Sequence, residues 1–338
     1  MRKLASIQRI KVLEPIEGAD AIERATVLGW QLVVKKGDYQ VGDLCIYVEI
    51  DSILPEKPEY EFLRNKHFRI KTIRLRGQIS QGICFPLSFL SPDFEIIEDA
   101  DCTEDLEIIK YEMPIPAHLS GLIKGPFPSF IPKTDETRVQ ILQTMLDKYA
   151  GTQCYITEKL DGSSATFYLK NGEFGVCSRN LELLDDDKNS FWKVAKEMKL
   201  EEKLRSMDGN FALQGELVGE GIQGNKLKIK GQTVFFFNIF DIDKHDFMSF
   251  ENLKQTLKTL DLPFVPVLSE NYILENDIQK IVERANVKTT LNPLAWAEGI
   301  VIRPLTEILD REFTNELDFG GRITFKAINP EFLIKYSE

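Results

Sequence analysis

Short runs of alternating apolar and polar residues fill the first 90 positions of the chain and predict strands there. The runs cover residues 6–13, 22–28, 30–35, 44–50, 68–75 and 78–85. Glycine-containing turns separate several of them. The apolar phase slips between Ile70 and Ile73, which indicates one extra residue in that strand, a β-bulge. We therefore predict a small β-barrel of the OB type, a fold that often binds oligonucleotides on one face.

The middle of the chain changes character twice. Residues 91–107 are acidic, and residues 114–132 hold five of the 15 prolines. Thr134 is then expected to cap a helix, whose apolar face carries Val139, Leu142, Leu146 and Tyr149. The predicted parts are an OB-like module, a proline-rich connector and a second domain, at 1–110, 111–134 and 135–338.

Strand-like runs dominate again from residue 151 onward, so the predicted fold class is α+β, with antiparallel sheets flanked by helices. Two of these runs flank Asn171-Gly172, a favoured two-residue hairpin turn. The hairpin register places Arg179 opposite Ser164, beside the strand that starts just after Lys159. The geometry thus groups a lysine and an arginine at one end of a sheet.

Two further helices are expected, one after Asn189 and a short one from Asn329-Pro330. Asp185-Asp186-Asp187 precedes the first of them. Adjacent side chains do not converge on one ion, so we interpret these aspartates as a solvated helix start and not as a metal site.

The composition is that of an ordinary globular protein. The chain has 338 residues, 43% of them hydrophobic, which is enough for two domains with cores. No apolar run approaches the ~20 residues of a membrane span, and no signal-peptide core follows Met1. Five widely spaced cysteines favour a reducing compartment, so we expect a cytoplasmic or nuclear protein without a membrane. The three distant histidines disfavour a histidine metal cage.

The net charge of −11 is unevenly distributed. Residues 1–90 hold 14 Lys/Arg and 11 Asp/Glu, a net charge of +3, whereas residues 91–110 hold eight acids and one lysine, a net charge of −7. Phosphate contacts need a local basic surface, not a basic total. One segment without acids supplies six cations, Arg64, Lys66, Arg69, Lys71, Arg74 and Arg76. We predict that they bind nucleic acid; the alternative is one solvated strand face.

Five polar motifs follow one another in the second half of the chain. They are Lys159-Leu160-Asp161-Gly162, Ser178-Arg179-Asn180, Gly215-Glu216-Leu217, Glu298-Gly299-Ile300-Val301 and Phe325-Lys326. Alone, the first is more often a surface lysine beside a turn. Several strands that each point a charged group inward would be costly unless these groups share a ligand. A triphosphate with magnesium would satisfy them all.

The motif order resembles that of the covalent nucleotidyltransferases, which comprise polynucleotide ligases and mRNA capping enzymes. The OB-like module in front, and the connector 127–136, resemble RNA ligases of the Deinococcus/Naegleria type. Only 12 residues follow Lys326, which leaves no room for the C-terminal OB module of DNA ligases and capping enzymes. Ile328 departs from the pattern, since some RNA ligases have a second lysine there.

The resemblance implies an ATP-dependent RNA ligase that joins 5′-phosphate and 3′-hydroxyl ends. Lys159 would carry AMP as a phosphoamide, with Lys326 as the second catalytic residue. The implied nucleotide-binding residues are Glu158, Arg179, Glu216, Phe237 and Lys326. Phe237 matches the base-stacking aromatic, although a slip of one residue would put Phe236 there.

A divalent ion follows from the chemistry of the nucleophile. Lysine attacks only when neutral, a nearby cation lowers its pKa, and carboxylates raise it. We therefore expect Mg²⁺ or Mn²⁺, held by Asp161, Glu216 and Glu298, to approach Lys159 through water. Without the metal, these carboxylates should keep the lysine protonated.

The expected partner is RNA or an RNA/DNA duplex with a nick, bound by a monomer. One alternative is an ATP-dependent DNA ligase or a GTP-using capping guanylyltransferase. The other is an RNA-binding protein with a relic nucleotide pocket.

Overall fold

The computed structural model describes residues 3–111 and 122–336, and its contacts divide these residues between two compact units. The first unit takes its residues from Met1–Pro114, Gln140–Gln143 and Pro330–Glu338, and the second from Ile115–Val139 and Thr144–Asn329. Part of the predicted connector, 112–121, lies outside the described residues. Within the described ranges, no helix combines the length and apolar character that crossing a bilayer requires.

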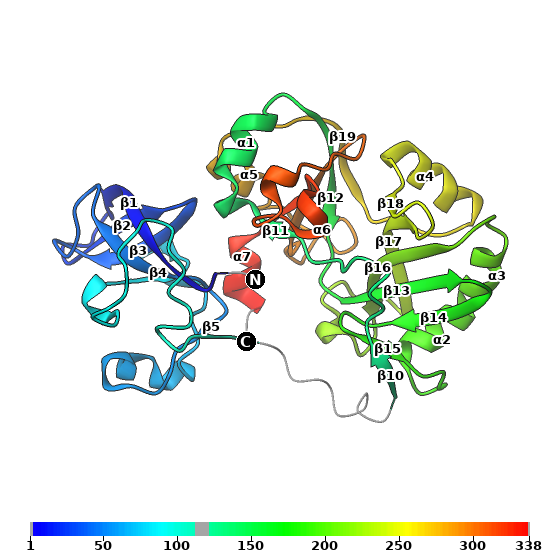
Figure 1. Cartoon of the computed structure of the whole chain (residues 1–338), viewed down its shortest axis with the longest axis horizontal. Helices are drawn as coiled ribbons and strands as arrows, with labels where there is room; N and C mark the ends of the chain where they lie inside the picture. Colours follow the sequence, from blue (N-terminus) through cyan, green and yellow to red (C-terminus); the bar gives the residue numbers. More distant parts are fainter. Residues whose placement is uncertain (1–2, 112–121, 337–338) are drawn as a thin grey trace. The chain divides into compact units, whose positions relative to one another are not determined.

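The first unit is built on an antiparallel sheet in the order β3-β2-β1-β4-β8 (Figure 1). These strands are β1 Ala5–Pro15, β2 Ile22–Val27, β3 Trp30–Lys35, β4 Leu44–Val48 and β8 Ile83–Phe85. Trp30, Tyr47 and Phe85 fill its core, against which Leu333 of the last helix also packs. The remaining elements are β5 Ser52–Ile53, η1 Pro58–Lys66, β6 Ile73–Leu75, β7 Gln78–Ser80, η2 Leu87–Phe89, β9 Ile109–Lys110 and α7 Pro330–Tyr336. The strand-rich OB-like module is confirmed.

The predicted bulge in 68–75 is wrong. Ile70 is buried, whereas Ile73 and Leu75 are exposed and belong to β6, which pairs with β7 in a hairpin of its own. The phase slip marks the end of one extended stretch and the start of another. The register shift in this sheet lies in β1, between Ile10 and Val12.

The second unit contains two sheets. The larger has the order β10-β15-β14-β13-β16-β17-β18. Its strands are β10 Ile123–Pro126, β13 Ser163–Lys170, β14 Glu173–Cys177, β15 Leu181–Leu183, β16 Phe211–Gly219, β17 Gln232–Asp241 and β18 Asp246–Phe247. Helices α2 Ser190–Glu197, α3 Leu200–Arg205 and α4 Phe250–Thr259 contribute to the apolar core on one of its faces (Figure 1). Phe167, Leu213 and Phe236 point into that core.

The other sheet has the order β11-β21-β20-β12-β19. Its strands are β11 Thr137–Arg138, β12 Gln153–Lys159, β19 Val267–Ile273, β20 Gly299–Pro304 and β21 Phe325–Ile328. The remaining helices are η4 Val139–Ile141, α1 Gln143–Tyr149, η5 Gln223–Asn225, α5 Ile278–Arg284, η6 Arg311–Phe313 and α6 Asp318–Gly321. The α+β class with antiparallel sheets and flanking helices is confirmed.

Local patterns predicted some elements better than others. The Asn171-Gly172 hairpin forms, with both residues in the left-handed region that such a turn requires, but its ladder ends at Cys177, before Arg179. The cap at Thr134 is wrong: its hydroxyl bonds Ser164 at 2.6 Å, and the following residues form β11. The helix begins later because the chain first pairs in parallel with β21.

A helix begins after Asn189 as predicted, and the Asn189 side chain caps it, but it ends at Glu197, because Lys199 in the left-handed region separates it from α3. Asp185 and Asp187 pair with Lys196 at 2.6 and 2.9 Å. This agrees with a solvated helix start.

Candidate active site

Strand pairing places the two lysines of the motifs on one face of the second sheet. Lys159 ends β12 opposite Gly299, and Lys326 lies opposite Val301 on the next strand but one. Directly paired residues share a face, and so do residues two apart in a strand. Gly299 is required there, because a Cβ would lie 2.2 Å from the carbonyl oxygen of Ala327.

Lys159 is held by carboxylates. Its Nζ donates to Glu298 Oε2 at 2.5 Å, and its side chain is 24% exposed. Burial alone lowers the pKa of Lys159, but Glu298, Glu216 and Asp161 outweigh it, so the pKa lies above the ordinary value. This agrees with the expectation that the metal-free site keeps the lysine protonated.

The carboxylates are themselves perturbed by their crowding. Burial raises the pKa of Glu216 to about 8, with Glu298 and Asp161 adding to the effect. Burial and Glu298 also raise the pKa of Asp161, whose Oδ2 accepts from Lys226 Nζ at 2.7 Å. Gly162, just before β13, lets the chain approach β16 closely, since a Cβ would lie 2.4 Å from the Leu217 carbonyl oxygen.

Lys326 shows the opposite shift. Burial, together with the positive charges of Lys159 and Arg138, lowers the pKa of Lys326 to about 7. Arg138 is its direct partner on β11. The Asp135 carboxylate acts against this shift and raises the pKa of Lys326. Its Oδ1 also pairs with Nη2 of the exposed Arg179 at 2.6 Å.

The position at which some RNA ligases have a second lysine is apolar in this chain. Ile328 is 4% exposed and lies opposite Gly299, on the same face as Lys159.

The two candidate stacking residues differ clearly in burial. Phe236 is fully buried in the core under the helices. Phe237 is half-buried and packs near Leu160 and Val265. It is the unpaired residue of a bulge between β16 and β17, and such bulges re-aim side chains beside active sites.

Glu158 lies on the face opposite Lys159, as successive strand residues do. Its Oε2 accepts from the amide and the hydroxyl of Thr290 at 2.9 and 2.8 Å. Its Oε1 is buried with no hydrogen-bond partner within the described part of the chain. A buried oxygen of this kind calls for a donor.

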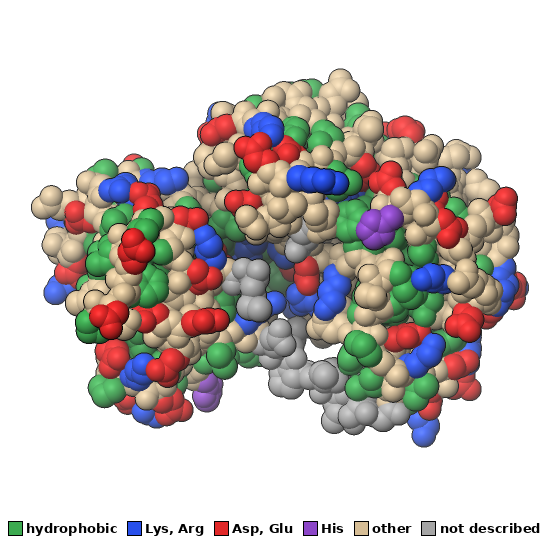
Figure 2. Space-filling model, in the orientation of Figure 1, with side chains coloured by type: hydrophobic (Ala, Val, Ile, Leu, Met, Phe, Trp, Pro, Cys, Tyr) green, Lys and Arg blue, Asp and Glu red, His purple; other side chains and the backbone are tan. Residues whose placement is uncertain are grey.

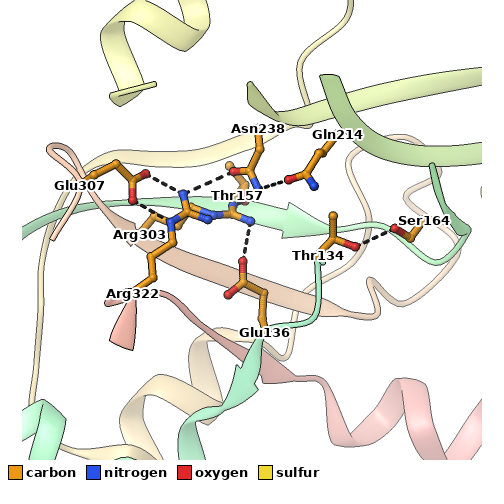
Figure 3. A network of polar contacts seen from close by, with 9 residues as sticks. All are labelled: Thr134, Glu136, Thr157, Ser164, Gln214, Asn238, Arg303, Glu307 and Arg322. Atoms are coloured by element: carbon orange, nitrogen blue, oxygen red, sulfur yellow. Dashed lines mark hydrogen bonds and ion pairs between the residues drawn. The ribbon is translucent and has the colours of Figure 1, made fainter. Parts of the chain in front are cut away.

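A buried polar network ties the strands of the site together (Figure 3). Arg303 donates to Glu136 at 2.9 Å and to Thr157, two residues before Lys159, at 3.4 Å. The other links are Arg322 to Glu307 at 2.6 Å, Arg322 to Asn238 at 3.5 Å and Asn238 to Gln214 at 3.2 Å. The strands β12 and β16, which carry Lys159 and Glu216, are therefore each anchored by buried side-chain contacts.

Three cations of the basic segment in the first unit, Arg64, Arg69 and Arg74, pair with acids. Arg64 contacts Glu61 and Glu56, Arg69 contacts Asp51 at 3.0 Å, and Arg74 contacts Glu331. Lys66 and Arg76 are exposed, and Lys71 is half-buried. On the face drawn in Figure 2, cationic and anionic side chains are interspersed.

The carboxylates form no ready-made metal cage. Among residues 3–111 and 122–336, no three acidic, histidine or cysteine side chains stand close enough to hold an ion directly. Instead, the ammonium groups of Lys159 and Lys226 occupy Glu298 and Asp161. The donors are oxygens only, which suits Mg²⁺ or Mn²⁺ held partly through water.

Sequence reasoning missed Asp135, Arg138 and Lys226. Arg138 reaches Lys326 through the parallel pairing of β11 with β21, and Asp135, three residues earlier, is close enough to raise the pKa of Lys326. No local pattern signals such a pairing, and Lys226 lies in a loop outside the motifs.

Comparison with known proteins gives consistent matches. A family profile described as an OB-fold domain matches residues 4–87, and one described as RNA ligase matches residues 152–328. No curated protein matches the chain.

Solved structures of an RNA ligase from Naegleria gruberi are similar over nearly the whole chain. A mutant without ligand is 37% identical, with a TM-score of 0.88 and 98% of each chain covered. A mutant with ATP and Mn has 37% identity, a TM-score of 0.88 and 100% of each chain covered. A mutant with AMP and Mn has 38% identity, a TM-score of 0.88 and 98% of each chain covered. The chain belongs to the RNA ligase family.

Proposed function

We propose that the protein is an ATP-dependent RNA ligase that seals 5′-phosphate and 3′-hydroxyl ends through a lysyl-AMP intermediate. The observation that carries the proposal is the cluster around Lys159, with Glu298 at 2.5 Å, Glu216 and Asp161 close by, and Lys326 on the same sheet face. Two of the related Naegleria structures contain ATP or AMP with Mn.

The chemistry needs a neutral amine. A free lysine has a pKa near ~10.4, so only about 0.04% is neutral at pH 7, a deficit of roughly 4–5 kcal/mol. A divalent ion, held through water by Asp161, Glu216 and Glu298, would offset their charge and lower the pKa of the lysine. Lys159 then attacks the α-phosphate and releases pyrophosphate.

Other residues bind and orient the nucleotide. Lys326 would neutralise the α-phosphate as charge develops on it, as phosphoryl transfer requires. Phe237 offers a ring for the base, and base stacking contributes ~1–3 kcal/mol. The unsatisfied Oε1 of Glu158 suits the exocyclic amine of adenine, whereas guanine carries an acceptor there.

The nucleic-acid partner is proposed to be a nicked duplex with RNA on the 3′-hydroxyl side. Arg179 would contact the ribose or the end phosphate, and Glu216 a ribose hydroxyl. The candidates in the first unit are Arg64, Lys66, Arg69, Lys71, Arg74 and Arg76. Lys66 and Arg76 are the strongest of these, since they are exposed and three others pair with acids.

Two experiments test the proposal. The protein is incubated with ATP or GTP labelled at the α-phosphate; ATP label should attach to the wild type and to an exposed-lysine control, Lys230→Ala, but not to Lys159→Ala. Label on Lys159→Ala would refute the nucleophile, and labelling by GTP would favour a capping enzyme. Nick sealing is then compared on matched duplexes whose 3′-hydroxyl strand is RNA or DNA. Equal sealing would contradict the RNA preference.

A further inference from the structure

Lys226 is a cation in the catalytic cluster that none of the sequence motifs contains. It lies in the loop between β16 and β17, and its Nζ is 2.7 Å from Asp161 Oδ2. The same ammonium donates to the carbonyl oxygen of Gln223 at 2.8 Å. The backbone carbonyl of Lys226 accepts from Asn292 Nδ2 at 2.8 Å. The loop is therefore anchored with its ammonium directed at Asp161.

The pair is well shielded from solvent. The side chains of Lys226 and Asp161 are 23% and 18% exposed, so their attraction is screened less than that of a surface pair. Burial and Glu298 raise the pKa of Asp161, and the contact with Lys226 acts against them. Lys226 thus neutralises a carboxylate that would otherwise add to the crowding around Lys159.

The Lys226 ammonium contacts the same carboxylate, Asp161, that is proposed to hold the divalent ion. A cation approaching Asp161 is repelled by the Lys226 charge and must displace it from the carboxylate. The Gln223 carbonyl can keep the displaced ammonium hydrogen-bonded.

We propose that Lys226 is a positioning residue that competes with the divalent metal ion for Asp161, and so sets the metal concentration at which the lysine is activated. The inference rests on the proposed role of Asp161 in holding the metal. Lys226 neutralises Asp161 while the metal is absent, and it raises the metal concentration that the reaction needs.

The test is Mn²⁺ binding to the nucleotide-free protein, measured as the loss of the free-ion signal in electron paramagnetic resonance. Lys226→Met keeps the length of the side chain and removes its charge, and is expected to lower the Kd for Mn²⁺ about tenfold, the equivalent of about 1.4 kcal/mol. Lys226→Arg keeps the charge and should bind Mn²⁺ like the wild type. Lys230→Met removes an exposed charge from the same loop and should change the Kd less than about twofold.

An unchanged or higher Kd in a folded Lys226→Met protein, checked by circular dichroism, overturns the inference. Equal tightening in Lys230→Met also overturns it, because the effect would then be a general one of loop charge. Asp161→Asn separates the inference from the proposed function. If that variant binds Mn²⁺ as tightly as the wild type, the metal role of Asp161 is wrong. If it binds more weakly while Lys226→Met is unchanged, only the competition is wrong.

Discussion

Replacing Lys326 should stabilise the nucleotide-free protein while removing a residue that the proposed reaction needs. Burial, Lys159 and Arg138 lower the pKa of Lys326 from 10.5 to about 7, so holding its proton in the folded state costs free energy. The difference is about 3.5 pH units, and at ~1.36 kcal/mol per unit the upper bound is about 4.8 kcal/mol. Solvent relaxation around a partly exposed side chain reduces this, and we expect Lys326→Met to gain about 2 kcal/mol at pH 7.

The lowered pKa of Lys326 determines how the free energy of unfolding changes with pH. Between pH about 7 and 10.5, the unfolded chain binds a proton at this lysine that the folded chain has lost, so the free energy of unfolding rises with pH in this window. The destabilisation caused by the charged Lys326 is complete below pH about 7 and absent above pH 10.5. The advantage of Lys326→Met should therefore shrink as the pH rises.

Urea unfolding of the wild type and of Lys326→Met, at about pH 7 and about pH 9.5, measures the change. Lys230→Met, which removes an exposed charge, is the control and should track the wild type at both pH values. A difference between Lys326→Met and the wild type that stays constant or grows with pH would refute the argument that the buried lysine is strained by its charge.

Three further predictions concern the base, the framework and the metal. Phe237→Leu should raise KM for ATP about tenfold without loss of stability, because it removes the proposed stacking ring. Phe236→Leu should instead lower the free energy of unfolding by about 1 kcal/mol and leave KM unchanged. Steady-state adenylylation measures KM, and urea unfolding measures the stability. Arg303→Met leaves the buried Glu136 carboxylate without its guanidinium and should cost about 3 kcal/mol, measured by urea unfolding against the double variant with Glu136→Gln. Burial raises the pKa of Glu216 to about 8, so Mn²⁺ binding should tighten between about pH 6.5 and about pH 8.5; equal affinity at both would contradict this shift.

The sequence predicted the parts of the site that depend on strand periodicity and local turns. In β16, Gln214 and Glu216 lie on the face opposite Leu213 and Leu217, which pack into the core with the helices, because side chains on a strand alternate strictly. The Asn171-Gly172 hairpin is equally local, since its two left-handed residues alone define the turn.

Contacts between distant segments were beyond the reach of these patterns. The ion pair of Arg303 with Glu136 joins residues 167 positions apart, and that of Lys226 with Asp161 joins residues 65 apart. Phe236 and Phe237 could not be separated either, because the bulge that sets them apart arises from the pairing of β17 with β16. The predicted helix cap at Thr134 is wrong for the same reason, because the residues that follow it form β11, which pairs with β21 nearly 190 residues later.

The opposed pKa shifts have a common physical origin. Burial disfavours every charged group, so Glu216 and Lys326 both shift toward neutrality, whereas Lys159 retains its proton because Glu298 contacts it directly. Without a metal, the cluster therefore holds Lys159, the proposed nucleophile, in its protonated form, and burial of the charged groups around it lowers the stability of the fold. In the proposed reaction, phosphate oxygens of the nucleotide would stabilise the charged form of Lys326, and the cation would stabilise the charged forms of the carboxylates. Under this proposal, nucleotide binding and activation of Lys159 are one electrostatic event, and a site optimised for stability alone would lose the ability to activate Lys159.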